Sequence, residues 1–339
     1  MSGKTYLDPI LVITSILYFC ACSGTVPVNP SGQKLVQKKV GSGDANADTA
    51  YDNSKRDDDS DPIETFPGSK NGDPIAEDED LDQPKDETQF CIDDSPKDFN
   101  KAGNFSVKKQ KRGSVNIYEP QDIPSGCRVP IVHLSNGTGA TCSYYGSILQ
   151  HLASHGFLAA CYESTSTGSG KPCMNSLETL LDEYSDIAAN KIGTTGHSQG
   201  GGAAITCGYL AEQKWGEKMQ IAIHAIEPAH GMSRSSWKSE YPKIKSPTFM
   251  LSGSADTIVP ASWVGQGYEV LNSPTYWYIA NGATHMNAQP WAAESALAWF
   301  RWQLLNDEAA KEKILSLDSD SRWRFKEKKQ VDKIEKFRS

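Results

Sequence analysis

The amino-acid sequence predicts an α/β fold with a mostly parallel central sheet flanked by helices. From about residue 90 to residue 305, short β-prone runs alternate with stretches of helical character. The β-prone runs are mostly apolar, which is typical of parallel strands that are buried on both faces. About 215 residues in this pattern fit one domain, expected at 89–305, rather than two.

Seven strands and five helices account for this region, and no segment between them predicts a lid domain. The expected strands are 115–118, 129–134, 157–162, 191–196, 222–226, 248–252 and 275–280. The expected helices are 144–154, 177–188, 200–212, 262–271 and 288–305.

The N-terminal segment, residues 1–22, predicts a signal peptide. Its apolar run, 9–19, is short for a membrane span. The run leads to Cys22, with Ala21 before it and Ser23 after it, which is typical of a bacterial lipoprotein, although Phe19 stands where leucine is usual. We expect export and a lipid anchor at Cys22 on the outer membrane or cell surface. The alternatives are simple secretion and an uncleaved anchor.

Residues 23–88 predict an acidic, disordered linker. From residue 42 to residue 87 the chain holds 16 acidic residues against 4 basic ones. Such a segment cannot bury enough apolar surface to offset its chain entropy, and its like charges favour an extended tether. The formal net charge is −8, and the middle of the chain has no basic stripe interleaved with aromatics. Nucleic acid is therefore not an expected partner.

Six cysteines remain if export removes the segment before Cys22 and that residue is lipidated. An even number in an exported protein favours disulfides, with the pairing left open. No C-x-x-C pair predicts zinc, and the acidic run 57–61 lacks the glycine and terminal glutamate of an EF-hand calcium loop. The six are Cys91, Cys127, Cys142, Cys161, Cys173 and Cys207.

The stretch TTGHSQGGGAA places Ser198 among four glycines, after a β-prone run and before a helix rich in small residues. Glycine weakens regular structure, so the cluster indicates a backbone on a tight path. The pattern G-x-S-x-G can expose a serine hydroxyl on a sharp strand-to-helix turn. We expect Ser198 to be a nucleophile; an idle serine in a glycine-rich turn is the alternative.

A serine nucleophile needs a base and an acid that orients the base, here expected in the order serine, acid, histidine. Asp256 follows strand 248–252, where a carboxylate would lie at the rim of the sheet. Glu227 also ends a strand and is the second choice. His285, in the loop before the last helix, is the expected base, with His230 next.

The oxyanion hole needs a backbone N–H from the loop after an early strand. Strand 129–134 leads into SNGTG, where glycines bracket Thr138. The main-chain amides of Thr138 and Gln199 are therefore the predicted donors. His197, which precedes the nucleophile, is expected in the wall of the cleft.

Four segments resemble the bacterial cutinase and polyester hydrolase group of α/β-hydrolases, which includes PET hydrolase-like enzymes. The segments are NGTG at 136–139, HLASHGF at 151–157, GHSQGGG at 196–202, and DTIVP at 256–260 together with GATH at 282–285. The resemblance covers roughly 131–305. It implies an α/β-hydrolase fold and ester hydrolysis through an acyl-enzyme, with no metal and no cofactor.

The chain departs from that group at several positions. Gln199 stands where methionine is usual, and Thr138 and Ala229 stand where aromatic-polyester hydrolases carry an aromatic clamp. Loss of ring stacking favours aliphatic esters or polyesters. The residues expected to contact substrate are His197, Ala229, His230 and Trp263, with Tyr144 and Tyr145 as a further aromatic wall.

Together these features predict an exported, monomeric serine ester hydrolase acting on an ester or polyester. The alternatives are a short-chain carboxylesterase or lipase that does not act on polymers, an enzyme cleaving amides or thioesters, and a non-catalytic surface lipoprotein that only binds. The segment 306–339 holds 10 basic and 8 acidic residues. We expect it to be a charged tail that packs only near Trp323 and Phe325.

Overall fold

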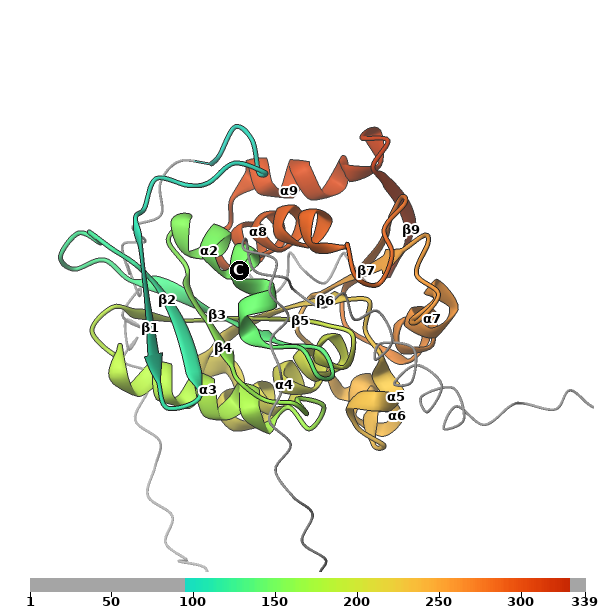
Figure 1. Cartoon of the computed structure of the whole chain (residues 1–339), viewed down its shortest axis with the longest axis horizontal. Coiled ribbons are helices and arrows are strands. Elements are labelled where there is room, and N and C mark those ends of the chain that lie inside the picture. The colour runs from blue at the N-terminus through green and yellow to red at the C-terminus, as the bar shows by residue number, and fades with distance from the viewer. Residues whose placement is uncertain (1–94, 330–339) are drawn as a thin grey trace, which may run out of the picture. The chain divides into compact units, whose positions relative to one another are not determined.

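The structure is a computed structural model that describes residues 95–329 (Figure 1). Within that range nine strands form a single sheet. In chain order they are β1 (Val107–Arg112), β2 (Val115–Pro120), β3 (Val129–Ser135), β4 (Leu158–Tyr162), β5 (Ala188–His197), β6 (Gln220–Ile226), β7 (Thr248–Gly253), β8 (Thr275–Ala280) and β9 (Trp323–Lys329).

The order across the sheet is β1-β2-β4-β3-β5-β6-β7-β8-β9. The strands from β4 to β8 in this order are parallel, whereas β1 pairs with β2, β2 with β4, and β9 with β8 in the antiparallel sense. Strands β3, β7 and β8 are buried at every residue, as expected of strands covered on both faces. The predicted α/β class, with a mostly parallel sheet flanked by helices, is confirmed.

Helices cover both faces of the sheet. They are α2 (Gly146–Ser154), α3 (Lys171–Glu183), α4 (Gln199–Trp215), α5 (His230–Ser233), α6 (Trp237–Glu240), α7 (Ala261–Val270), α8 (Gln289–Leu305) and α9 (Glu308–Leu315), with a short 3-10 turn η1 (Cys142–Tyr145) before α2. Helices α2 and α8 pack on one face, and α3 and α4 pack on the other (Figure 1). Because parallel strands end at the same edge, the loops after β3, β5, β6, β7 and β8 meet there.

Helix α3 and strand β1 differ from the sequence-based expectation. Helix α3 spans Lys171–Glu183 rather than 177–188, because Pro172 fits the first turn of a helix and Ala188 already pairs with Val129 as part of β5. Strand β1 was not predicted. Its sequence, VKKQKR, has no apolar run because it is an edge strand that pairs only with β2.

The folded domain extends past its expected end at residue 305. Helix α9 and strand β9 follow, and Trp323 is buried. The carboxylate of Glu294, a fully buried residue of α8, lies 2.7 Å from the amine of Lys313 and 2.9 Å from the guanidinium of Arg322. The charged segment after residue 305 is therefore a structural part of the domain as far as Lys329, the last described residue.

Two disulfides connect elements of the domain. Cys142–Cys161 links η1 to β4, and Cys173–Cys207 links α3 to α4. Both agree with the expectation that the cysteines pair. The first bridge fixes the segment that carries two tyrosines described below.

Several expectations concern residues outside the described range. The signal peptide at 1–22 with Cys22, the linker at 23–88, Cys91 and residues 330–339 all lie there. Among the residues that the structure describes, no helix combines the length and the apolar character needed to cross a bilayer.

Removing residues 306–339 should destabilise the domain. The truncated chain loses β9 and leaves the Glu294 carboxylate buried without Lys313 and Arg322. Removing the partner of a buried charge typically costs about 3–5 kcal/mol, so we expect a loss of unfolding free energy of about that size. Urea unfolding measures it, with a chain ending at residue 329 as the control. Equal midpoints for both truncations would contradict the structural role of this segment.

Candidate active site

Ser198 lies on the turn between β5 and α4 with a strained backbone. Its φ of 60° and ψ of −123° are in a region that residues other than glycine rarely occupy. The conformation is held by its amide, which donates to the Ile226 carbonyl at 3.0 Å, and by its carbonyl, which accepts from the amides of Gly201 at 2.9 Å and Ala229 at 3.0 Å. The sequence-based expectation of a sharp strand-to-helix turn therefore describes this segment well.

The glycines around Ser198 are needed because three backbones meet there. A Cβ atom at Gly200 would lie 2.0 Å from the carbonyl oxygen of Ser135, in β3. A Cβ atom at Gly196 would lie 2.1 Å from the carbonyl oxygen of Gly200. These contacts are with main-chain atoms, which cannot rotate away. The glycine cluster thus allows β3, β5 and α4 to converge beneath the serine.

The loops after β7 and β8 bring Asp256 and His285 together. Nδ1 of His285 lies 2.8 Å from Oδ2 of Asp256, and Oδ1 of Asp256 accepts hydrogen bonds from the amides of Ile258 and Val259, both at 2.8 Å. Burial alone would raise the pKa of Asp256, but the hydrogen bonds from His285 and these amides give a net lowering. Asp256 is therefore an ionised partner for the imidazole.

His285 lies close to the residue that precedes Ser198. The ring of His197, which directly precedes Ser198, lies 4.5 Å from the ring of His285, measured between centroids. Within residues 95–329, no hydrogen bond joins the Ser198 hydroxyl to His285. Such bonds between nucleophile and base are often longer in the absence of substrate. Ser198, Asp256 and His285 are each at most 7% exposed, so their electrostatic interactions are little weakened by water.

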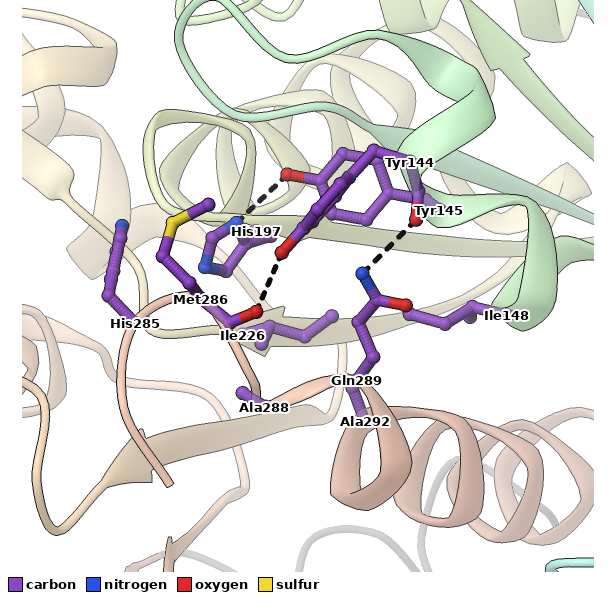
Figure 2. A pocket seen from close by; sticks show the side chains of 10 residues that line it. All are labelled: Tyr144, Tyr145, Ile148, His197, Ile226, His285, Met286, Ala288, Gln289 and Ala292. Carbon is purple, nitrogen blue, oxygen red and sulfur yellow. Dashed lines mark hydrogen bonds between the residues drawn. The ribbon is translucent and has the colours of Figure 1, made fainter. Parts of the chain in front are cut away.

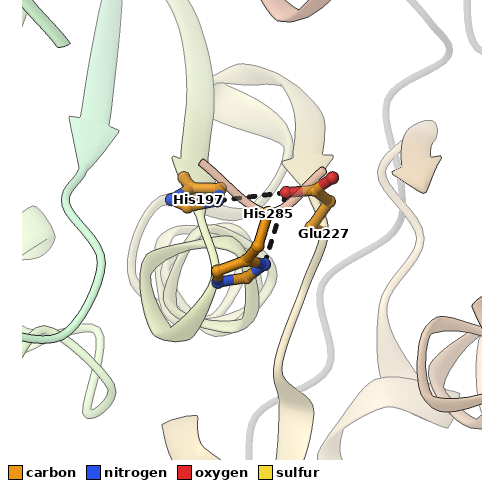
Figure 3. A group of neighbouring side chains, drawn as sticks. All are labelled: His197, Glu227 and His285. Atoms are coloured by element: carbon orange, nitrogen blue, oxygen red, sulfur yellow. Dashed lines mark hydrogen bonds and ion pairs between the residues drawn. The ribbon is translucent and has the colours of Figure 1, made fainter. Parts of the chain in front are cut away.

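Glu227 adds a second buried carboxyl group to the site. Its Oε2 lies 3.1 Å from Nε2 of His197 and 3.4 Å from Nδ1 of His285 (Figure 3). Burial, followed by the negative charge of Asp256, raises the pKa of Glu227 to about 9. Both carboxyl groups that the sequence offered as the acid thus face His285, and Asp256 makes the shorter contact.

His197 connects Glu227 to Tyr145, a residue that the sequence analysis placed only in an aromatic wall. Nδ1 of His197 lies 2.9 Å from the Tyr145 hydroxyl, which also accepts from the amide of Gly137 at 3.1 Å. Burial, and then the proximity of His285, lowers the pKa of His197 to about 3. No local sequence pattern marks Tyr145, because its partners, Gly137 in the loop after β3 and His197 at the end of β5, belong to other elements.

A small pocket opens beside His197 and His285 (Figure 2). It encloses about 220 Å³, part of it open to solvent. The Tyr144 hydroxyl donates to the Met286 carbonyl at 2.6 Å, and Nε2 of Gln289 donates to the Tyr144 carbonyl at 3.1 Å. These two hydrogen bonds join Tyr144 to the segment that carries Met286 and Gln289. The lining residues are Tyr144, Tyr145, Ile148, His197, Ile226, His285, Met286, Ala288, Gln289 and Ala292. His197 therefore lies in the wall of a cleft, as expected.

The two predicted oxyanion donors have main-chain amides without a protein partner. Among the described residues, neither Thr138 nor Gln199 donates an amide hydrogen bond. Thr138 is exposed in the loop after β3, and Gln199 is the first residue of α4. The Gln199 side chain is held by the Thr167 amide at 3.3 Å and the Met232 carbonyl at 3.0 Å, which leaves its own main-chain amide available.

Three other predicted contact residues, Ala229, His230 and Trp263, do not line the pocket. His230 is buried between Trp237 and Tyr241, and its nitrogens face the Tyr241 hydroxyl at 3.2 Å and the Val264 carbonyl at 3.3 Å. Burial lowers the pKa of His230 to about 4, and its position in the core does not suit a base for Ser198. Trp263 and Ala229 are not among the residues that line the pocket. Ala229 is buried behind the Ser198 main chain.

Within residues 95–329, His197, Glu227 and His285 are also placed so that they could together hold a metal ion. Their donor atoms lie within 4.8 Å of one another. Nδ1 of His285, however, already faces Asp256, and Nε2 of His197 faces Glu227. The hydrogen bonds explain the cluster, and we assign it no metal.

Comparison with known proteins gives no family, since no protein-family model and no curated protein matches the chain. The chemistry must therefore be judged from the site itself. A serine on a strained turn, an imidazole paired with a carboxylate, and free amides near the serine together suit nucleophilic attack on a carbonyl group.

Replacing Gly200 with alanine should disrupt the turn at Ser198. The new methyl group would meet the Ser135 carbonyl oxygen at 2.0 Å, so the β3 loop or α4 must move. We expect a loss of about 3 kcal/mol or more in unfolding free energy. Gly231→Ala is the matched control, because a Cβ atom there meets nothing within 4 Å. Similar urea midpoints for both variants would refute the close approach.

Glu227→Gln should change how stability depends on pH. The pKa of Glu227 rises from 4.5 in the unfolded chain to about 9 in the folded one. Between these two pH values, only the folded state keeps the proton. Wild-type stability therefore falls as pH rises, by at most about 1.4 kcal/mol per pH unit from this group. The Gln variant lacks this loss and should gain stability relative to wild type between about pH 5 and pH 8. Parallel stability curves would contradict a protonated Glu227.

Proposed function

We propose that the protein is a serine hydrolase that cleaves carboxylic esters through an acyl-enzyme, on a fold of the α/β-hydrolase type. The observation that carries this proposal is Ser198 at positive φ on the β5–α4 turn, at the sheet edge where His285 pairs with Asp256. Backbone strain of this kind costs about 1–3 kcal/mol and is concentrated at functional sites. The order of serine, acid and histidine along the chain also agrees with this fold.

In the proposed mechanism, Ser198 attacks the ester carbonyl while His285 accepts its proton at Nε2, because Nδ1 faces Asp256. The Asp256 carboxylate stabilises the imidazolium that forms. The amides of Thr138 and Gln199 donate to the oxyanion. His285 then protonates the leaving alcohol, and water attacks the acyl-enzyme with the same base.

The pocket favours small acyl groups. The space in it that the centre of a water molecule can occupy is only about 10 Å³, which is about the amount that one bound water needs. Ala229 is buried and Thr138 offers no ring, so an aromatic clamp is lacking on both sides. We infer that aliphatic esters or polyesters are preferred. A short-chain carboxylesterase that does not act on polymers is the second candidate, favoured by the bridge from Tyr144 to Met286.

Export belongs to the same proposal. The two disulfides suit an oxidising compartment. A lipid anchor at Cys22 would hold the domain at the membrane surface, with 23–88 as its tether. We propose a monomer with an ester or polyester as its partner, without nucleic acid.

Hydrolysis of p-nitrophenyl esters from acetyl to palmitoyl, compared with a Ser198→Ala variant, tests the function. We expect turnover with the shorter chains and a loss of about a thousandfold or more in the variant, because the nucleophile is gone. Circular dichroism should show that both proteins are folded. A variant that keeps more than about a tenth of the turnover would exclude Ser198 as nucleophile. A folded wild type without turnover would favour a binding function.

A further inference from the structure

Glu227 occupies a place that the fold has shaped for it. The residue ends β6 in the left-handed region, with φ of 46°, and its side chain is fully buried. A Cβ atom at Gly253, where β7 ends, would lie 2.5 Å from the main-chain oxygen of Ala283 and 2.5 Å from Oε1 of Glu227, so the glycine leaves room for both. Glu227 is thus a buried acid with a strained backbone, next to a position where a larger side chain would not fit. This combination indicates a specific role for Glu227.

The contacts of Glu227 join the two halves of the site. On one side its Oε2 lies 3.4 Å from Nδ1 of His285, the proposed base. On the other side the same oxygen lies 3.1 Å from Nε2 of His197 (Figure 3). His197 leads through the Tyr145 hydroxyl to the amide of Gly137, which precedes the proposed oxyanion donor Thr138. One side chain thus links the base to the oxyanion loop.

The surroundings determine which of the two carboxyl groups is charged. Asp256 makes the shorter contact with His285, at 2.8 Å, and also accepts from two main-chain amides. Oε1 of Glu227 is buried and has no hydrogen-bond partner in the described part of the chain. Two carboxylates that face one imidazole in a buried site repel each other, so one keeps its proton. The donors favour charge on Asp256.

We propose that Glu227 is a positioning residue that, as a neutral acid, orients the imidazole of His285 and, through His197 and Tyr145, the oxyanion loop. The proposal rests on the proposed ester hydrolysis, because it assigns His285 and Thr138 their roles. Burial and the charge of Asp256, which raise the pKa of Glu227 to about 9, agree with it. His285, Asp256, His197 and Tyr145 are the titratable groups that face this part of the site.

Steady-state kinetics of two Glu227 variants tests the positioning. Glu227→Ala removes both contacts, so kcat should fall at least about tenfold while KM stays within about threefold. Glu227→Gln keeps the size and neutrality of the side chain and should retain kcat within about threefold near pH 7. Glu294→Gln is the matched control, because it changes another fully buried glutamate that lies in the ion-pair cluster of α8, α9 and β9. It should leave kcat unchanged.

The two carboxyl groups should also compensate for each other. Without the charge of Asp256, Glu227 can ionise and accept from Nδ1 of His285, so Asp256→Asn should lose less activity than is usual for this acid, which is about 10⁴-fold. Adding Glu227→Gln to that variant should lower kcat further, by more than Glu227→Gln does alone. Strictly multiplicative effects would count against a shared role.

Nitrogen NMR of the histidine rings gives a readout that does not depend on turnover. The ring signals of His197 and His285 should move in Glu227→Ala, return close to wild type in Glu227→Gln, and stay unchanged in Glu294→Gln. Unchanged His197 and His285 signals in Glu227→Ala would overturn the proposal even if the protein hydrolyses esters. If the signals move in Glu227→Ala but the wild-type protein shows no turnover that depends on Ser198, the contacts of Glu227 are supported and only the proposed ester hydrolysis is rejected.

Discussion

The left-handed backbone of Ser198 is the constraint on which the rest of the site depends. Around it, the end of β3, the end of β5 and the start of α4 approach to distances that exclude a side chain at Gly196 and Gly200. The Ile226 carbonyl fixes the serine amide from the neighbouring strand. Once this turn is formed, the first amide of α4 follows the serine directly. The loop after β3 is held in part by a side chain, because the Tyr145 hydroxyl accepts from the amide of Gly137.

The electrostatics of the site follow from placing two carboxyl groups and two imidazoles in a largely buried space. Hydrogen bonds from His285 and from two main-chain amides keep Asp256 charged. The Glu227 carboxyl group instead faces the imidazoles of His197 and His285, and the charge of Asp256 raises its pKa further. Burial lowers the pKa of His197 to about 3, so this ring is neutral and can serve as a link. The Cys142–Cys161 bridge ties the segment that carries Tyr145 to β4, which helps hold the other end of that chain of contacts.

The sequence alone predicted those parts of the fold and of the site that a local pattern of residues marks. Apolar runs gave the central strands, and the glycines around Ser198 predicted the turn. Asp256 and His285 were expected at one edge of the sheet because the loops after parallel strands meet there, and the structure brings the two into contact. Strands β1 and β9 were missed because both are edge strands rich in lysine. In β9 only Trp323 and Phe325 are apolar, which indicated local packing but not a strand.

Other features depend on contacts that no local pattern carries. The sequence offered Glu227 and Asp256 as alternatives, but only the three-dimensional structure brings both to His285. His230 follows a strand end, as a site residue would, yet it packs against Trp237 and Tyr241 in the core. Disulfide pairing was likewise open until Cys142 was found beside Cys161.

Covalent trapping of the nucleophile tests the central claim most directly. The protein and its Ser198→Ala variant would each be treated with a fluorophosphonate, and the adduct would be located by peptide mass spectrometry. If Ser198 is activated by His285 and Asp256, a single adduct forms on the peptide that contains Ser198, and the variant stays unmodified. An adduct on another residue, or none in the folded protein, would contradict an acyl-enzyme at Ser198.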